Sequence, residues 1–237
     1  MASSGLRSLS AVFVGSLLFG AVTFVVLRRL QLNRSGRQTK ILSENEFTEV
    51  MRILAKRIFQ QLFSFAQVSA RIVPKSDENQ LFSIRFDNPA IRDLLEFSQQ
   101  SVLEQFHLSS EDLEHAQSLY CGKGHDELDK IVESIPTMFD QFASGSFPVL
   151  PTEVVGETSE FDSAHVLDIL STILTAKTES DPDSVDEESI IRSAGYWDTI
   201  PFYNDVAKRM RSDTEFRNGL VQILMNNQTL VRSRLDE

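Results

Sequence analysis

The sequence predicts an all-α protein: an N-terminal single transmembrane helix followed by a multi-helix bundle or an irregular helical array. Three observations indicate this fold class. Residues 9–27 form a run of nineteen residues without a charge. Apolar side chains recur at spacings of three and four in several later segments, which is the period of an amphipathic helix. One short run alternates as a strand does, and a single strand cannot pair its backbone groups.

The composition is that of a folded protein. The 237 residues are 41% hydrophobic and 24% charged, with ten glycines and seven prolines, which is typical of one or two domains. A single cysteine excludes an internal disulfide and a cysteine-based zinc finger. The net charge of −11 argues against nucleic acid as a partner, because phosphate recognition needs clustered Lys and Arg.

Residues 9–27 are predicted to span a membrane. A helix of this length measures about 28 Å, close to the ~30 Å hydrocarbon core of a bilayer. A buried core helix is usually shorter, a cleaved signal peptide has a shorter apolar run, and a mitochondrial presequence carries more arginine. A retained signal anchor therefore fits best. The residues expected in lipid are Leu9, Phe13, Leu17, Leu18, Phe19, Phe24, Val25 and Leu27.

A basic flank follows this run and predicts its orientation. Residues 1–43 hold six basic side chains and no acid, whereas the remainder holds 17 basic and 34 acidic ones. The positive-inside rule then places residues 28–237 on the cytosolic side, with the lipid bilayer as the first partner. The outer mitochondrial membrane, the endoplasmic reticulum and the peroxisome all fit. The basic flank consists of Arg28, Arg29, Arg34, Arg37 and Lys40.

Residues 44–142 are predicted to form a helical domain. The clearest helix covers residues 45–73, and further helices are expected at about 87–107, 109–120 and 126–142. Residues 82–86 alternate between apolar and polar and are expected to be extended or short-helical. The apolar stripe of the first helix is Phe47, Val50, Met51, Leu54, Ile58, Leu62 and Phe65.

The second half of the chain begins with residues 143–160, which have no helical period and contain two prolines and two glycines. They are predicted to be a linker or a loop laid over the bundle. Residues 161–237 are expected to form a C-terminal helical segment, either on the same core or as a separate domain. Its helices are expected at 161–176 and 214–230, with an acidic loop over 178–189 between them.

Catalytic motifs are missing from the sequence. It contains no glycine-rich dinucleotide or phosphate loop, no His-Glu-x-x-His and no Gly-x-Ser-x-Gly. Residues 121–125 read Cys-Gly-Lys-Gly-His, where a base lies near a thiol, but the two glycines equally predict a plain turn between helices. We therefore expect a protein that is not an enzyme and that holds no cofactor or metal.

Two features are candidates for contact with a partner protein. Six acids within residues 179–188 fail the EF-hand pattern, because Asp186 stands where glycine is needed and Arg192 where glutamate is needed. They are predicted to form a solvated loop, with docking of a basic partner as the alternative. The aromatic residues near 196–203 either close the C-terminal core, which we favour, or form an interface hot spot. The candidate contacts are Tyr196, Trp197, Phe202, Asp186, Glu187 and Glu188.

Together these features predict a single-pass membrane-anchored interaction protein, an adaptor or scaffold. It would present an acidic helical domain at a membrane surface to a protein partner that the sequence does not identify. The alternative is a structural accessory subunit of a larger membrane complex, for which mitochondria are one location.

Overall fold

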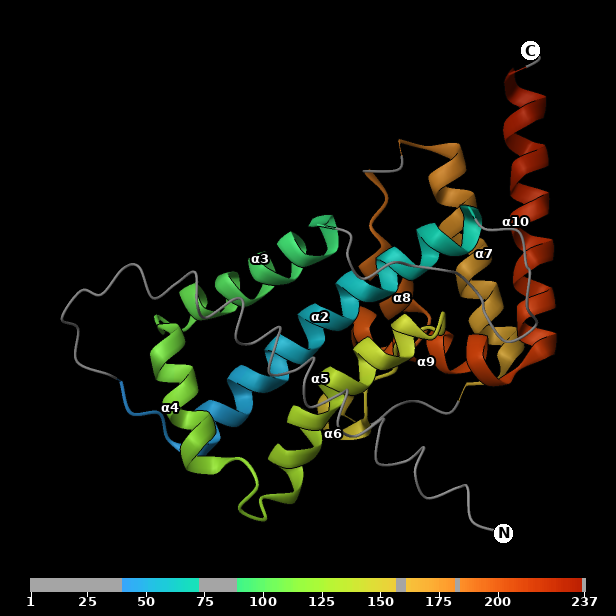
Figure 1. Cartoon of the computed structure of the whole chain (residues 1–237). Helices are drawn as coiled ribbons and strands as arrows, with labels where there is room; N and C mark the ends of the chain where they lie inside the picture. Colours follow the sequence, from blue (N-terminus) through green and yellow to red (C-terminus); the bar gives the residue numbers. More distant parts are fainter. Residues whose placement is uncertain (1–39, 73–88, 157–160, 182–183, 236–237) are drawn as a thin grey trace, which may run out of the picture. The chain divides into compact units, whose positions relative to one another are not determined.

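The computed structural model describes residues 40–72, 89–156, 161–181 and 184–235 (Figure 1). These residues form helices and no strand, so the predicted all-α class is confirmed for them. No helix in these ranges is long and apolar enough to cross a membrane. The predicted anchor at 9–27, the first four residues of the basic flank and the alternating run at 82–86 lie outside the described residues.

The chain divides into two compact units, the first ending at Val154 and the second beginning at Val155. The first unit is built around the long helix α2, which contacts α3, α4 and α5. Its helices are α2 (Glu44–Ile72), α3 (Pro89–Gln105), α4 (Ser110–Tyr120), α5 (Asp126–Ala143) and the one-turn α6 (Thr152–Val155), whose last residue falls in the second unit.

Helix α2 forms because its apolar positions follow the helical period and because Ser43 and Glu46 cap its start. The Glu46 carboxylate accepts the Ser43 backbone N–H at 2.8 Å, and the Glu46 N–H reaches the Ser43 hydroxyl at 3.3 Å, which is a capping box. Every residue of the predicted stripe is buried except Phe65, which is half-buried. Phe59, Phe63 and Ala66 are buried as well, so α2 is covered on more than one side.

Residues 143–154 lie on the core of the first unit. Phe147, Leu150 and Val154 are buried, and the ring of Phe147 lies 5.4 Å from that of Phe63. The apolar side chains of this stretch reach the core from an irregular backbone, so their spacing in the sequence does not follow the helical period. The short α6 within it was not predicted.

In the part of the second unit that the structure describes, α7 contacts α8, α9 and α10. Aspartates at the N-caps of α7 and α8, Asp162 and Asp186, accept backbone N–H groups from the first turns. Helix α8 begins at Glu187, so the acidic loop ends earlier than predicted. Helix α9 was not predicted. The helices are α7 (Ser163–Glu179), α8 (Glu187–Ser193), α9 (Thr199–Ser212) and α10 (Thr214–Leu235).

Candidate functional site

The aromatic residues predicted as partner contacts divide between the core and the surface of the second unit. Tyr196 is 2% exposed and Phe202 is fully buried, whereas the adjacent Trp197 is 50% exposed. A partner could reach Tyr196 or Phe202 only if the second unit opened, so these two residues are removed from the candidate contact. Their burial follows from ring packing: Phe161 and Phe202 lie 4.9 and 5.2 Å from the Tyr196 ring.

The hydroxyl of Tyr196 has a polar partner in this core. It donates a hydrogen bond of 2.8 Å to Oδ2 of Asp205 on α9. Burial, and then this hydrogen bond to a carboxylate, raise the pKa of Tyr196 well above its ordinary value. Tyr196 therefore stays neutral at physiological pH, and its hydroxyl serves to fix the aromatic cluster rather than to transfer a proton.

Arg209 extends this polar network from α9 to both neighbouring helices. Its Nε lies 3.2 Å from Oδ1 of Asp205, and its Nη1 donates to the Ser163 hydroxyl at 2.5 Å. Ser163 in turn donates to Oδ2 of Asp213 at 2.7 Å, the residue that caps α10. The network is partly buried and joins the starts of α7 and α10 to α9, so its role is to hold the second unit together.

The three predicted acidic contacts lie at the start of α8, with Asp186 as its N-cap, and already have partners within the second unit. The Asp186 carboxylate accepts the Ser189 N–H at 3.0 Å as the α8 cap. Glu187 pairs with Lys177 and accepts a hydrogen bond from the Tyr203 hydroxyl. Glu188 lies 2.6 Å from Arg192, one turn along the helix. A basic partner would have to compete with these contacts, although Asp186 and Glu188 are exposed.

The Cys121 and His125 pair does not have the electrostatics of a nucleophile. Burial, and then the nearby Asp129 carboxylate, raise the pKa of the Cys121 thiol, whereas nucleophilic cysteines need a lowered one. His125 directs Nδ1 toward Oε1 of Glu44 at 2.6 Å. Across the ranges that the structure describes, no three His, Cys, Asp or Glu side chains lie close enough together to hold a metal ion.

Sequence reasoning missed the contact between the end of the basic flank and α4. The backbone N–H of Lys40 donates to Oδ1 of Asp112 at 2.5 Å, and the Ser109 N–H donates to Oδ2 of the same carboxylate at 2.7 Å. Asp112 is 1% exposed. The Ser109-x-x-Asp112 spacing signals a capping box, but nothing in the sequence signals that the same carboxylate holds a residue 72 positions away.

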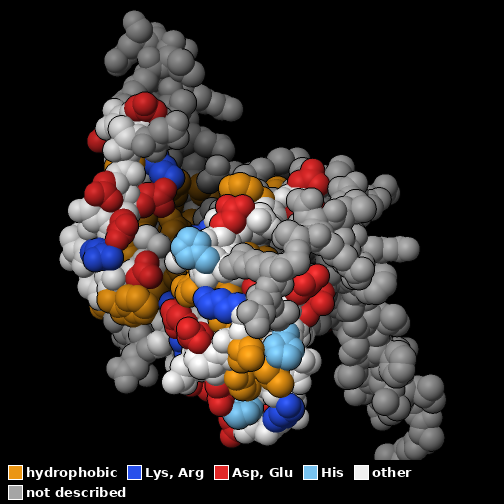
Figure 2. Space-filling view, turned by 90° about the vertical axis from the view of Figure 1, so that its left-hand side faces the viewer, with side chains coloured by type: hydrophobic (Ala, Val, Ile, Leu, Met, Phe, Trp, Pro, Cys, Tyr) orange, Lys and Arg blue, Asp and Glu red, His pale blue; other side chains and the backbone are white. Residues whose placement is uncertain are grey.

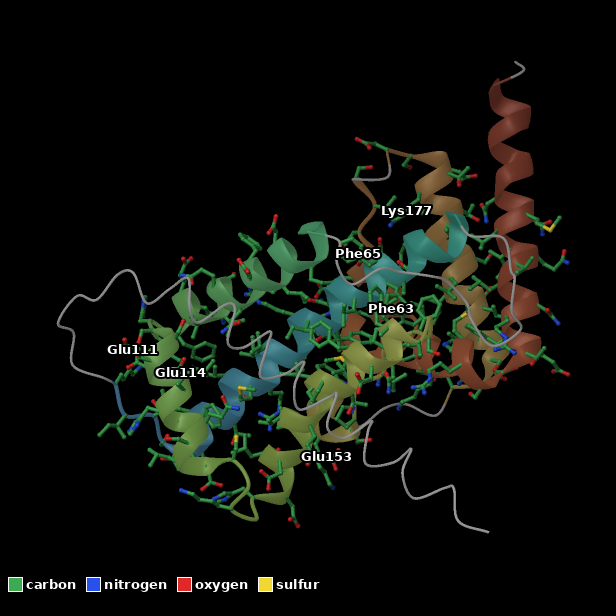
Figure 3. The ribbon with its side chains drawn as sticks, in the orientation of Figure 1. Phe63, Phe65, Glu111, Glu114, Glu153 and Lys177 are labelled. Atoms are coloured by element: carbon green, nitrogen blue, oxygen red, sulfur yellow. The ribbon has the colours of Figure 1, made fainter. Side chains whose placement is uncertain are left out.

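Ion pairs join α2, α5 and α6 on the surface of the first unit. Arg52 on α2 pairs with Glu49, and its Nη2 lies 2.6 Å from Oε1 of Glu127 on α5. Lys130 on α5 lies 2.7 Å from Glu153, which Figure 3 labels. Exposed pairs of this kind contribute little individually. Both basic side chains, Arg52 and Lys130, have acidic partners here, as expected where acidic residues outnumber basic ones.

Large apolar side chains on the surface are the remaining candidates for contact. Val221 and Met225 are four residues apart on α10 and so share one face of that helix, and Figure 2 shows apolar, acidic and histidine side chains interspersed on the face that it draws. Single exposed apolar residues are common, so each needs a further argument before it indicates a contact. The exposed large apolar residues in the described ranges are Ile41, Phe97, Trp197, Val221 and Met225.

Comparison of the chain with protein-family models, with curated proteins and with solved structures gave no match.

Proposed function

We propose that this chain is a single-pass membrane-anchored interaction protein, which holds two acidic helical units beside a membrane and presents them to a protein partner. The observation that carries the proposal is the uncharged run at residues 9–27, followed directly by the basic flank. A nineteen-residue helix matches the bilayer core, and basic groups beside it favour the cytosolic leaflet.

The short tether between the anchor and the first unit supports the adaptor role. Twelve residues separate Leu27 from Lys40, where the described fold begins. Fully extended, that stretch of chain spans at most about 45 Å. The first unit is therefore kept within a protein diameter of the lipid, as suits a protein that recruits a partner to a membrane.

Trp197 is the residue that we propose for the partner contact. It is the only tryptophan in the chain and half of it is exposed, and tryptophan is strongly enriched among residues that dominate binding energy. The neighbouring Tyr196 is fixed in the core, so the backbone that carries Trp197 is held in place. Such preorganisation lowers the entropic cost of binding.

Membrane anchoring is tested by alkaline carbonate extraction of cellular membranes. The full-length chain is expected in the pellet, and protease protection should find residues 30–237 on the cytosolic side. Recovery of the intact chain in the supernatant would overturn the anchor. A variant that lacks residues 1–27 is the control: it keeps the contacts of Lys40, Leu42 and Ser43 and should be found in the supernatant.

The partner contact is tested by affinity purification of the full-length protein from detergent-solubilised membranes, comparing Trp197→Ala with Met225→Ala. Met225 is also exposed and lies in the same unit, so it controls for the loss of an apolar surface residue. Trp197→Ala is expected to lose the partner and Met225→Ala to retain it. Equal retention by both variants would refute the contact. Comigration of the chain with one large complex on a native gel would instead favour the accessory-subunit alternative.

A further inference from the structure

The segment of residues 40–42 is fixed on both sides of one exposed side chain. The Lys40 N–H is held by the buried Asp112 carboxylate, and the Leu42 carbonyl accepts a hydrogen bond of 2.9 Å from the Tyr120 hydroxyl. Leu42 itself is 2% exposed. Ile41 lies between these two anchored residues and is 74% exposed. Its side chain is therefore presented outward by the fold and is not a loose end.

The reason for this outward position is local geometry. Leu42 is buried in the core while its neighbour Ile41 is exposed, so the two side chains leave the backbone toward different surroundings. Neither hydrogen bond involves the side chain of Ile41, and either would form equally well with a polar residue there. The two hydrogen bonds that hold this segment therefore do not require an isoleucine at position 41.

We propose that Ile41 and Lys40 contact the membrane surface, with Ile41 entering the headgroup region of the bilayer. This inference rests on the proposed membrane anchor. The tether ends at Lys40, so residues 40–42 are the part of the first unit that is covalently closest to the lipid. An apolar residue beside a lysine suits the interface. The Lys40 ammonium is exposed, 3.5 Å from the Phe106 carbonyl, and can stay at the hydrated level of the headgroups while the isoleucine leaves water.

The charges around this segment identify the kind of lipid surface. Glu111 and Glu114 lie exposed on α4, the helix that holds Lys40, and Figure 3 labels both. Their carboxylates oppose attraction to an anionic surface. Contact by Ile41 is therefore driven by burial of apolar area, and a zwitterionic phosphatidylcholine surface suffices for it.

The proposal includes an orientation of the first unit, in which α2 starts at the lipid and runs away from it. Helix α2 begins two residues after Leu42, and Ser64 lies twenty residues further along the helix from Glu44. At about 1.5 Å per residue this is about 30 Å. The segment of residues 40–42 is expected at the lipid surface, and Ser64, which is exposed, well away from it.

Depth-dependent fluorescence quenching tests this orientation. The full-length chain, with Cys121→Ser to remove its one thiol, is reconstituted into phosphatidylcholine vesicles that contain a lipid with a nitroxide quencher near the headgroup. A fluorophore is attached at Ile41→Cys, and in the control variant at Ser64→Cys. We expect quenching at position 41 to be at least about twofold stronger than at position 64, since an interfacial group lies about 5–10 Å into the headgroup and acyl boundary.

The outcomes separate this inference from the anchor on which it rests. If alkaline carbonate releases the chain from the vesicles, the anchor itself fails. If the chain stays bound but positions 41 and 64 are quenched equally strongly, the anchor stands and the orientation of α2 is refuted; if neither position is quenched, the lipid contact of Ile41 is refuted. Shielding of position 41 that depends on protein concentration and not on the quencher lipid would also refute it, in favour of a second copy of the chain. Lys40→Cys gives a second comparison: it keeps the backbone hydrogen bond to Asp112 and removes only the long, exposed contact of 3.5 Å from Nζ to the Phe106 carbonyl.

Discussion

Removal of the buried Asp112 carboxylate should weaken the first unit. Asp112 is 1% exposed, and its carboxylate accepts N–H groups from Lys40 and Ser109, at 2.5 and 2.7 Å. In Asp112→Ala the helix cap is lost, which costs about 1 kcal/mol. The Lys40 N–H loses a charged acceptor as well, which costs about 1.5–3 kcal/mol. Together these effects predict a loss of about 2.5–4 kcal/mol in the free energy of unfolding.

The measurement is thermal and urea denaturation of the full-length protein in detergent, followed by far-ultraviolet circular dichroism. For a domain of this size the loss corresponds to a fall in Tm on the order of 10–20 °C. Glu111→Gln is the matched control, because it removes a first-turn acid from the same helix but at an exposed position. It is expected to cost at most about 1 kcal/mol, the contribution of a charge near a helix N-terminus. If both variants unfold alike, the buried carboxylate does not hold residue 40 as described.

Three further predictions concern a glycine, a cap and the cysteine. Gly195 has a φ of +104°, and a Cβ there would lie 2.9 Å from Cζ of Phe161, whereas at Gly124, with a φ of +85°, a Cβ would meet nothing within 4 Å. Gly195→Ala should therefore destabilise the protein by about 2–3 kcal/mol and Gly124→Ala by about 1 kcal/mol, and equal shifts in urea denaturation would contradict the steric argument. Hydrogen bonds from the Phe216 N–H and then from the Ser163 hydroxyl hold the pKa of Asp213 below its ordinary value. Because this pKa is lowered in the folded state, the stability from Asp213 is fully present at neutral pH and is lost as the pH falls through the lowered pKa. Asp213→Asn should therefore reduce the fall in Tm that the protein shows as the pH is lowered into the acid range. An unchanged fall would show that Asp213 does not contribute to it. Burial raises the pKa of the Cys121 thiol. At pH 7.5, about one unit below an ordinary thiol pKa, its alkylation by iodoacetamide should therefore be slower in the folded chain than in urea. A faster reaction in the folded chain would indicate an activated thiol.

The predicted helices agree with the structure where local signals decide the outcome. Helix α2 begins one residue before the predicted start and ends one residue before the predicted end, because a capping serine and a proline bracket one continuous apolar stripe. Helix α9 was missed because its buried residues Ile200, Phe202 and Val206 share the segment with a proline at position 201. Proline is tolerated in the first turn, where the backbone N–H has no partner within the helix.

The sequence by itself determined the helical class, the acidic charge of the chain after residue 43 and the basic flank that precedes it. These properties depend on residue type and on spacings of three or four, which a helix converts directly into a buried face. The exposure of individual residues outside helices was decided by the tertiary structure. Tyr196 and Trp197 are adjacent aromatic residues, yet one is in the core and the other at the surface, because Phe161 and Asp205 from other elements surround only the first.

The same distinction explains why the Lys40 and Asp112 contact was not predicted. Local spacing shows that Asp112 can cap α4, but its second bond goes to a backbone N–H 72 residues earlier in the chain. A carboxylate has enough lone pairs to accept both hydrogen bonds, and only the packing of residues 40–42 along α4 brings the second donor within reach. Residue type thus sets which bonds a side chain can make, and long-range packing selects the ones that form.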